Sequence, residues 1–315
     1  MTTAQLTAHV QADAVGELPA PVRPIPHPVA AGVRRAVEGL RSLGPADLVH
    51  GLDVDLPWRV GGPCVSTVHD MAVFDVPWAF SAVRARGERF LVRRSLQRAD
   101  AIVAVSAFTA ERVKTLIGKD ATVTHLAPAP HLVPADAGTV AAVRARHDLP
   151  ARFVLQVGTM EPRKDVAALA QACRTVDVPC VLAGGVGAGQ HVPDGVRHLG
   201  YVDADELPAL YGAATIVAYI SSYEGFGLPP VEAMACGAPV VATRVGGLGE
   251  VAEGAAALVN HGDADALAGT LARLLADDHE RADLAGRGLA RARSLTWGRT
   301  AATTLEVYRR LGVAA

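Results

Sequence analysis

Six short apolar runs separated by helical patterns constrain the fold of this chain more than any other feature of its sequence. The runs are rich in β-branched residues and lie at residues 153–157, 180–183, 196–199, 215–220, 239–242 and 256–259. Strands that alternate with helices form a parallel sheet with helices on both faces, because each parallel connection needs a crossover. We therefore predict an α/β fold with a doubly wound parallel sheet in the second half of the chain.

The first half of the chain carries the same alternation in a weaker form. Strands are expected at residues 47–50, 65–69, 101–105 and 123–127. A helix is expected among them at residues 81–98. Upstream of Asp47 the sequence is rich in proline, and only residues 5–10 fit a strand. We therefore predict a second Rossmann-like domain, with most of its strands downstream of Asp47.

Three prolines between residues 127 and 134 interrupt the pattern between the two halves. We place the linker there and predict a first domain over residues 1–134 and a second domain over residues 135–299. A chain of 315 residues is long enough for two domains of roughly 150 residues, each with its own core. The remaining residues, 300–315, are predicted to form a helix that returns to the first domain.

The composition argues against several classes of protein. Half of the residues are apolar and a fifth are charged, which is too hydrophobic for a disordered chain. The formal net charge of -2 gives no positive field, so we expect no nucleic-acid partner. The four cysteines lack the spacing of a zinc site, and neither an apolar run of ~18 residues nor a secretion signal is visible. We expect reduced thiols in a cytoplasmic protein.

The first candidate binding segment, residues 157–165, runs from the end of a strand through a turn into a helix. Open α/β sheets bind ligands at this edge, outside the carboxyl ends of the strands. Arg163 and Lys164 lie there beside the N-terminus of the helix, which Asp165 is placed to cap. A guanidinium beside an ammonium suits a diphosphate, and a solvated pair of charges is the alternative.

The second candidate segment, residues 221–232, also leaves a strand and enters a helix. Gly225 and Gly227 allow its backbone to come close to a ligand. Two consecutive prolines suit the first turn of the helix, which places Glu232 inside the helix and Glu224 in the loop before it. A carboxylate can accept hydrogen bonds from both hydroxyls of a ribose, so Glu232 is a candidate for that role. A favourable interaction with the helix dipole is the alternative.

Four stretches together resemble the retaining GT-B glycosyltransferases of family four, the glycosyl transferases group 1, which include mannosyltransferases acting on lipid and polysaccharide acceptors. The stretches are residues 99–113, 158–165, 221–260 and 296–311, and the third contains a Glu-x7-Glu pair. The resemblance covers roughly Asp47 to the C-terminus. It implies a GT-B fold, in which two Rossmann-like domains face a cleft. It also implies transfer of a hexose from a nucleoside-diphosphate sugar to a glycan or lipid-linked acceptor.

The resemblance further implies roles for individual residues. In the family, the matching arginine and lysine bind the donor diphosphate, the second glutamate binds ribose, and the first glutamate meets the sugar together with the glycine loop. The stretch that contains Tyr201 and Val202 matches the part that lines the nucleobase, with strand-end packing as the alternative. The expected donor-binding residues are Gly158, Arg163, Lys164, Tyr201, Val202, Glu224, Gly225, Phe226, Gly227, Leu228 and Glu232.

In the first half, residues 67–70 match the family's strand that ends in His-Asp. The resemblance implies that His69 faces the cleft and binds the sugar or the acceptor, whereas a histidine at a strand end is otherwise more often structural. Asp70 is expected to orient His69 or to cap a turn, and Ser106 is a further candidate for the cleft. The expected catalytic residues are His69, Arg163, Lys164 and Glu224.

Three Asp-x-Asp strings, at residues 53–55, 203–205 and 263–265, are similar to the metal motif of the other large glycosyltransferase fold. Two of them open helices, where aspartate is an ordinary cap. Arg163, Lys164 and a helix dipole can neutralise a leaving diphosphate without a metal ion. We therefore expect metal-independent transfer, with retained anomeric configuration and without a further cofactor.

The helix expected at residues 81–98 is rich in arginine. The segment from Ser81 to Asp100 holds six arginines against two acidic residues, a local excess of +4. Anionic lipid surfaces attract such segments, which predicts peripheral contact with the inner face of a membrane. A solvated basic face is the alternative.

The N-terminus departs from the family pattern. Family members begin with a strand and a glycine-rich loop that faces the donor phosphate and the acceptor, and nothing before Asp47 matches them. We expect an incomplete first domain that lacks at least one strand-helix unit, and a reading frame that extends upstream of Met1. Two other functions stay open, an inactive glycosyltransferase-like protein that binds a nucleotide and a GT-B nucleotide-sugar epimerase.

Overall fold

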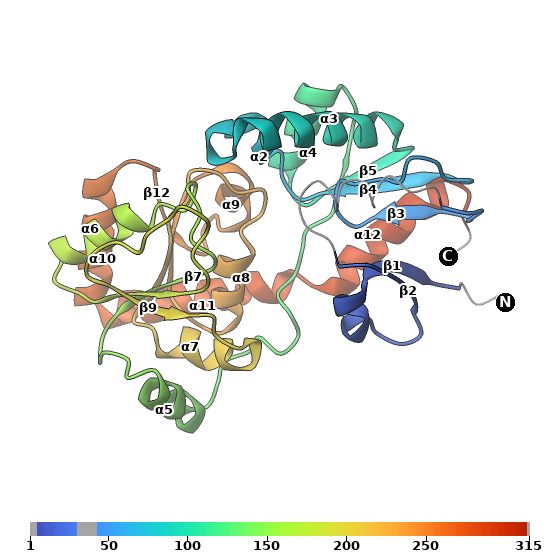
Figure 1. Cartoon of the computed structure of the whole chain (residues 1–315). Coiled ribbons are helices and arrows are strands. Elements are labelled where there is room, and N and C mark those ends of the chain that lie inside the picture. Colours follow the sequence, from blue (N-terminus) through green and yellow to red (C-terminus); the bar gives the residue numbers. More distant parts are fainter. Residues whose placement is uncertain (1–4, 30–42, 314–315) are drawn as a thin grey trace.

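The computed structural model describes residues 5–29 and 43–313. It confirms the α/β class and shows two Rossmann-like domains, the first at the right of Figure 1 and the second at the left. All paired strands of the described ranges run parallel. No helix in these ranges is long and apolar enough to cross a membrane.

The second domain is built on a six-stranded sheet in the order β12-β11-β10-β7-β8-β9. Its strands are β7 (Val154–Val157), β8 (Cys180–Ala183), β9 (Val196–Gly200), β10 (Ile216–Tyr219), β11 (Val240–Thr243) and β12 (Ala257–Val259). All six expected strands are present, with ends shifted by at most one residue. The chain winds outward from β7 on one side and from β10 on the other. The loops after these two strands therefore diverge and leave a crevice, which is where such sheets bind ligands.

Helices cover both faces of this sheet. α6 (Val166–Thr175) and α10 (Ala264–Ala276) pack on one face, and α7 (Leu207–Ala213) and α8 (Leu228–Ala235) pack on the other. Successive residues of a strand point to opposite faces of the sheet, so Val154 and Leu155 of β7 pack in different cores. Both cores are apolar, which explains why these strands are continuous apolar runs. The other helices are α5 (Ala137–Arg146), α9 (Gly246–Val251) and α11 (Asp278–Ser294).

The first domain contains a four-stranded sheet in the order β3-β4-β5-β6. α3 (Ala82–Arg98) packs on one face with α4 (Ala107–Ile117), whereas α12 (Trp297–Arg310) packs on the other, where Val307 shares a core cluster with Val65 and Val103. β1 and β2 form a separate two-stranded sheet, and β1 corresponds to the strand expected at residues 5–10. The elements are β1 (Thr7–Gln11), β2 (Arg23–His27), β3 (Val49–Gly51), β4 (Cys64–Val68), α2 (Ala72–Asp75), α3 (Ala82–Arg98), β5 (Ala101–Ala104), α4 (Ala107–Ile117), β6 (Thr122–Val123) and α12 (Trp297–Arg310).

The strand expected at residues 123–127 ends early, because β6 covers only two residues. His125 Nε2 lies 3.0 Å from Glu250 Oε1 of the second domain, and Ala127 packs in a cluster with Phe226. These contacts draw the chain away from the first sheet and toward the second domain. The chain returns through α12, which extends back across the first domain in Figure 1.

Candidate active site

The two candidate binding segments meet at the crevice of the second sheet. The loop after β7 and the loop after β10 are joined through their backbones: the Asp165 N–H donates to Ile220 O (3.0 Å), and the Ser222 N–H donates to Arg163 O (2.8 Å). Asp165 caps α6 as expected, because its side chain accepts from the N–H of Ala168. The two loops therefore form one continuous ledge at the carboxyl edge of the sheet.

Arg163 is the centre of an ion-pair network on this ledge. Its Nη1 lies 2.6 Å from Glu224 Oε1 and donates to Tyr223 O at 3.0 Å, and its Nε lies 3.0 Å from Glu161 Oε2. Burial lowers the pKa of Arg163, but nearby negative groups, Glu224 first, outweigh burial and raise the pKa above its ordinary value. The guanidinium therefore stays charged, and within the described residues its Nη2 has no hydrogen-bond partner.

Glu224 is buried, and the hydrogen bonds that it receives from the described residues reach only one of its oxygens. Its Oε1 accepts from Arg163 and from the hydroxyl of Tyr219, which lies 3.0 Å away. Burial and the Glu224 charge raise the pKa of Tyr219 well above its ordinary value, so this hydroxyl remains a donor. Tyr219 was not among the site residues expected from the sequence. The available signal was that it carries the one polar side-chain group in the apolar strand β10.

Lys164 differs from the other lysines in its surroundings. Lys114 forms an ion pair, and Lys119 donates to two backbone carbonyls. The Lys164 ammonium lies 5.6 Å from the centre of the Tyr219 ring, and a Cβ added at Gly158 would lie 2.9 Å from Nζ. Burial lowers the pKa of Lys164, and no carboxylate of the described ranges lies at ion-pair distance. Such a desolvated cation favours an anionic ligand.

Glu232 lies inside α8, which begins at Leu228 with prolines in its first turn, as expected. The hydroxyl of Tyr211 donates to Glu232 Oε2 at 3.2 Å, and burial raises the pKa of Glu232. Gly227 precedes the helix with a φ of 90°, and a Cβ there would collide with a leucine of α9. The predicted separation of the two glutamates into helix and loop is thus confirmed.

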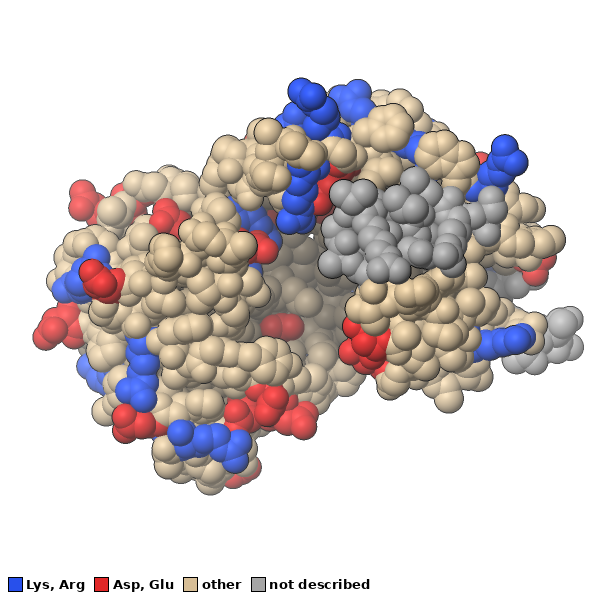
Figure 2. All heavy atoms as spheres, viewed as in Figure 1, with Lys and Arg blue, Asp and Glu red and all other residues tan. Residues whose placement is uncertain are grey.

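The first domain reaches the same ledge through the end of β4. His69 is exposed there, and its Nε2 lies 2.9 Å from Leu52 O. Asp70 caps the following turn by accepting from the Ala72 N–H at 2.8 Å, which is one of its two expected roles. Gly225 packs on this turn so closely that an added Cβ would overlap the carbonyl oxygen of His69. The two domains therefore meet at these residues, and Figure 2 shows the molecule hollowed between them.

Three expected residues have side chains that are buried rather than directed into the cleft. Phe226 packs in an apolar cluster between the domains, and Val202 packs in the core of the second domain, which was its alternative role. Ser106 is fully buried, and its Oγ donates to Gly225 O at 2.6 Å. These three side chains pack inside the protein, whereas a contact of Phe226 or Val202 with the donor through the backbone stays a prediction. Tyr201, by contrast, is 81% exposed after the end of β9.

Of the two Asp-x-Asp strings that were expected to cap helices, only one does so. Asp263 caps α10 by accepting from the Ala266 N–H, as expected. Asp203 makes no such bond at the short 3-10 turn that it precedes, so the expected cap is wrong there. Within the described ranges, no three His, Cys, Asp or Glu side chains gather as a metal site would require.

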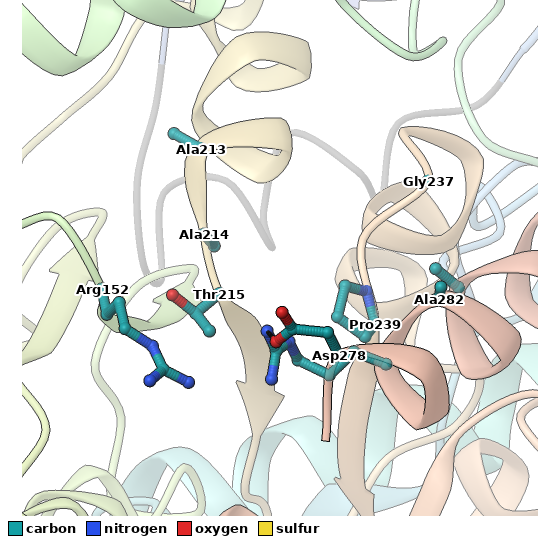
Figure 3. A pocket seen from close by; sticks show the side chains of 10 residues that line it. Arg152, Ala213, Ala214, Thr215, Gly237, Pro239, Asp278 and Ala282 are labelled. Atoms are coloured by element: carbon teal, nitrogen blue, oxygen red, sulfur yellow. Dashed lines mark hydrogen bonds and ion pairs between the residues drawn. The ribbon is translucent and has the colours of Figure 1, made fainter. Parts of the chain in front are cut away.

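A hollow of about 590 Å³ lies at the opposite edge of the second sheet, among residues that precede β7, β10 and β11 (Figure 3). Arg152 donates to Leu275 O, and Arg281 donates to Leu274 O. These carbonyls belong to the last turn of α10, so both guanidiniums cap a helix. Since none of the expected site residues lines this hollow, it is distinct from the candidate active site.

Comparison with known proteins identifies the family. Residues 3–129 match the family described as Glycosyltransferase Family 4, and residues 143–290 match the family described as Glycosyl transferases group 1. O-antigen chain mannosyltransferase B of Escherichia coli is 34% identical over 284 residues, which cover 84% of this chain and 74% of that protein. The chain is a family 4 glycosyltransferase. The family match begins at residue 3, further toward the N-terminus than Asp47, where we expected the resemblance to start.

Solved structures confirm the GT-B fold of this glycosyltransferase. Sucrose-phosphate synthase from Thermosynechococcus elongatus is similar with a TM-score of 0.73 and 26% identity, over 85% of this chain and 74% of the synthase. HepE from Anabaena, solved in complex with UDP-glucose, is similar with a TM-score of 0.67 and 21% identity, over 84% of this chain and 78% of HepE. The expected fold and the expected enzyme class are therefore both confirmed.

Proposed function

We propose that this glycosyltransferase moves a hexose, mannose or a close relative, from a nucleoside-diphosphate sugar to a hydroxyl of a glycan or lipid-linked acceptor in polysaccharide biosynthesis. The anomeric configuration is retained. The observation that carries the proposal is the convergence of Arg163 and Lys164 with Glu224 in the crevice of the second sheet. The name of the Escherichia coli relative supports mannose, and the UDP-glucose complex of HepE supports a nucleotide-sugar donor.

Arg163 and Lys164 hold the donor diphosphate in this proposal. The free Nη2 of Arg163 and the Lys164 ammonium are donors that the described residues leave available. The Asp165 side chain already accepts from an N–H of α6, so we assign the diphosphate to the two cationic side chains rather than to the helix N-terminus. Charge develops on the diphosphate as the glycosidic bond breaks, and fixed cations stabilise that transition state. Transfer therefore needs no metal ion or further cofactor.

The remaining residues hold the other parts of the donor. Glu232 accepts from the ribose hydroxyls, and Tyr201 lies near the nucleobase. Glu224 accepts a sugar hydroxyl through Oε2, because Oε1 is already occupied. His69 approaches the sugar or the acceptor from the first domain, which is supported by the contact between Gly225 and its backbone.

A donor panel tests this function. The purified enzyme is incubated with GDP-, UDP- and dTDP-sugars and a hydroxyl acceptor, with and without a chelator, and the product is analysed by NMR. We expect a retained anomeric linkage from one donor, with equal rates in the presence of the chelator. An inverted linkage contradicts retention, and loss of activity with the chelator contradicts metal independence. Donor conversion without an acceptor identifies an epimerase, and nucleotide binding without turnover identifies an inactive homologue.

We further propose that the enzyme acts in the cytoplasm and contacts the inner face of a membrane through α3. Phe90 of α3 is 62% exposed, Trp78 in the segment before α3 is 59% exposed, and Arg86 and Arg93 of α3 are exposed. Basic side chains gather over α3 at the top of Figure 2. Aromatic rings interleaved with arginine suit the surface of an anionic bilayer.

Sedimentation with lipid vesicles tests this contact. We expect binding to phosphatidylglycerol vesicles that weakens with salt, little binding to phosphatidylcholine, and loss of binding on Phe90→Ser with Trp78→Ser. Equal sedimentation with and without vesicles contradicts the contact.

A further inference from the structure

Tyr223 belongs to the second domain by its place in the chain, but its side chain is seated in the first domain. Its hydroxyl donates to Asp75 Oδ2 at 3.0 Å and accepts from the Met71 N–H at 3.2 Å. Its ring meets the ring of Phe108 nearly edge-on, with 5.7 Å between the centroids. Only 6% of Tyr223 is exposed.

The socket that receives Tyr223 is held together by contacts inside the first domain. Arg112 of α4 makes two hydrogen bonds to Asp75, at 2.9 and 2.5 Å. Ala72 and Val76 provide apolar walls. Burial, and then the charge of Asp75, raise the pKa of Tyr223, so its hydroxyl stays protonated and can donate. The Asp75 carboxylate is therefore oriented by Arg112 and presents an acceptor to the incoming hydroxyl.

The backbone of Tyr223 is bonded to the donor site. Its carbonyl accepts from Arg163 Nη1 at 3.0 Å, and the next residue, Glu224, accepts from the same nitrogen. The residue after that, Gly225, has its carbonyl bonded to Ser106 Oγ of the first domain at 2.6 Å. Tyr223 thus has its side chain in one domain and its backbone bonded to the cationic site of the other.

We propose that Tyr223 is a positioning residue that sets the placement of the first domain against the donor site during transfer. This inference rests on the proposed function. Two domains joined by a linker and a returning helix can move relative to each other, and the hydrogen bond to Asp75 exists only when they are together. Loss of this contact leaves the bonds of Glu224 within the second domain intact. It therefore slows transfer and spares nucleotide binding.

Two substitutions at Tyr223 test the inference. Tyr223→Phe removes the hydroxyl and should lower kcat about tenfold, whereas Tyr223→Ala also empties the socket and should lower kcat about a hundredfold. Affinity for UDP and GDP, measured by calorimetry, should stay at the wild-type value. Tyr308→Phe is the matched control, because it removes a partly buried hydroxyl that contacts His50. This control should keep wild-type turnover.

A double substitution and a scattering measurement complete the test. The kcat of the double variant, Asp75→Ala with Tyr223→Phe, should be no lower than that of the more impaired single variant. Both changes remove the same hydrogen bond, so their effects should not add. Small-angle X-ray scattering should show the domains of Tyr223→Ala further apart than in the wild type.

The outcomes separate this inference from the proposed function. Wild-type kcat in both Tyr223 variants overturns the inference, as does a loss of kcat matched by an equal loss of nucleotide affinity. If the wild-type enzyme transfers no sugar from any donor, the proposed function fails. The scattering comparison then still decides whether Tyr223 holds the domains together.

Discussion

The Arg163 guanidinium and the Glu224 carboxylate form a 2.6 Å ion pair that links the two loops of the donor site. Their side chains are 19% and 10% exposed, so each charge is largely removed from water and depends on the other. Lys164, the next residue, has no ion pair with any carboxylate of the described part of the chain. Substitutions of the two neighbouring cations should therefore differ in their effect on stability.

Lys164→Ala should lower turnover and leave the fold intact. The variant loses a charged donor to the leaving diphosphate, and comparable losses lower kcat about a hundredfold or more. The free energy of unfolding should not fall, because burial of the ammonium outweighs the attraction of Glu224 and Glu161, and no carboxylate of the described ranges lies at ion-pair distance from it. Kinetics at saturating donor and thermal unfolding by circular dichroism measure the two effects. Near-normal kcat in a folded variant would contradict the assignment.

Arg163→Ala should lower both turnover and stability. Without the guanidinium, Glu224 remains buried with the Tyr219 hydroxyl as its neutral partner. An uncompensated buried group costs about 1 to 3 kcal/mol, so the urea midpoint should fall relative to that of Lys164→Ala. Arg163→Lys restores a charge without the forked donor geometry and should recover stability only in part. Equal midpoints for the two alanine variants would show that the ion pair contributes nothing.

Glu232→Gln should weaken nucleotide binding. The amide replaces one of the two acceptor oxygens by a donor NH2 and removes the charge, and hydrogen bonds to charged groups contribute about 1.5 to 3 kcal/mol. Burial raises the pKa of Glu232, and protonation removes its charge and turns one acceptor oxygen into a donor. The affinity of the wild type for the nucleotide should therefore fall as the pH is lowered toward the raised pKa of Glu232. The affinity of the Glu232→Gln variant should not show this pH dependence. Calorimetric titration at several pH values checks both points, and unchanged affinity at neutral pH would refute the assignment.

Gly225→Ala should impair transfer by separating the domains locally. Its new Cβ would overlap the carbonyl oxygen of His69, so the first domain must shift away. The matched control is Gly269→Ala in α10, where a new Cβ meets nothing within 4 Å and should stabilise the helix by about 0.5 to 1 kcal/mol. Turnover and thermal unfolding of both variants decide the outcome. Wild-type turnover in Gly225→Ala would mean that the close approach is dispensable.

His50 should make stability depend on pH. It contacts Tyr308 of α12 through Nδ1 (2.6 Å) and Thr67 through Nε2 (2.7 Å), and burial lowers its pKa to about 4. An unfolded histidine takes up a proton near pH ~6.5, so the stabilisation from neutral His50 is complete above that pH. It is lost as the pH falls from ~6.5 to about 4. Urea unfolding across this range should show a steeper loss for the wild type than for His50→Gln, and identical profiles would contradict the shift.

Much of the second domain follows from neighbouring residues alone. Its strands are continuous apolar runs because both faces of the sheet are covered, and this pattern is visible in the sequence. Asp165 and Asp263 cap their helices through N–H groups three residues away, and the prolines before Glu232 start α8. The convergence of Arg163 with the Glu224 loop was also predictable, since both follow strands at one edge of a parallel sheet.

The sequence by itself thus determined the strand and helix order of the second domain, the caps and the residues at its crevice, because these depend on short-range spacing. Only the tertiary structure decided where the side chain of Tyr223 packs, since its hydrogen-bond partner Asp75 lies 148 positions away in the other domain. The same holds for the early end of β6 and for the burial of Phe226 between the domains. The physical reason is that contacts between domains depend on how two separately folded surfaces fit, which no local pattern encodes.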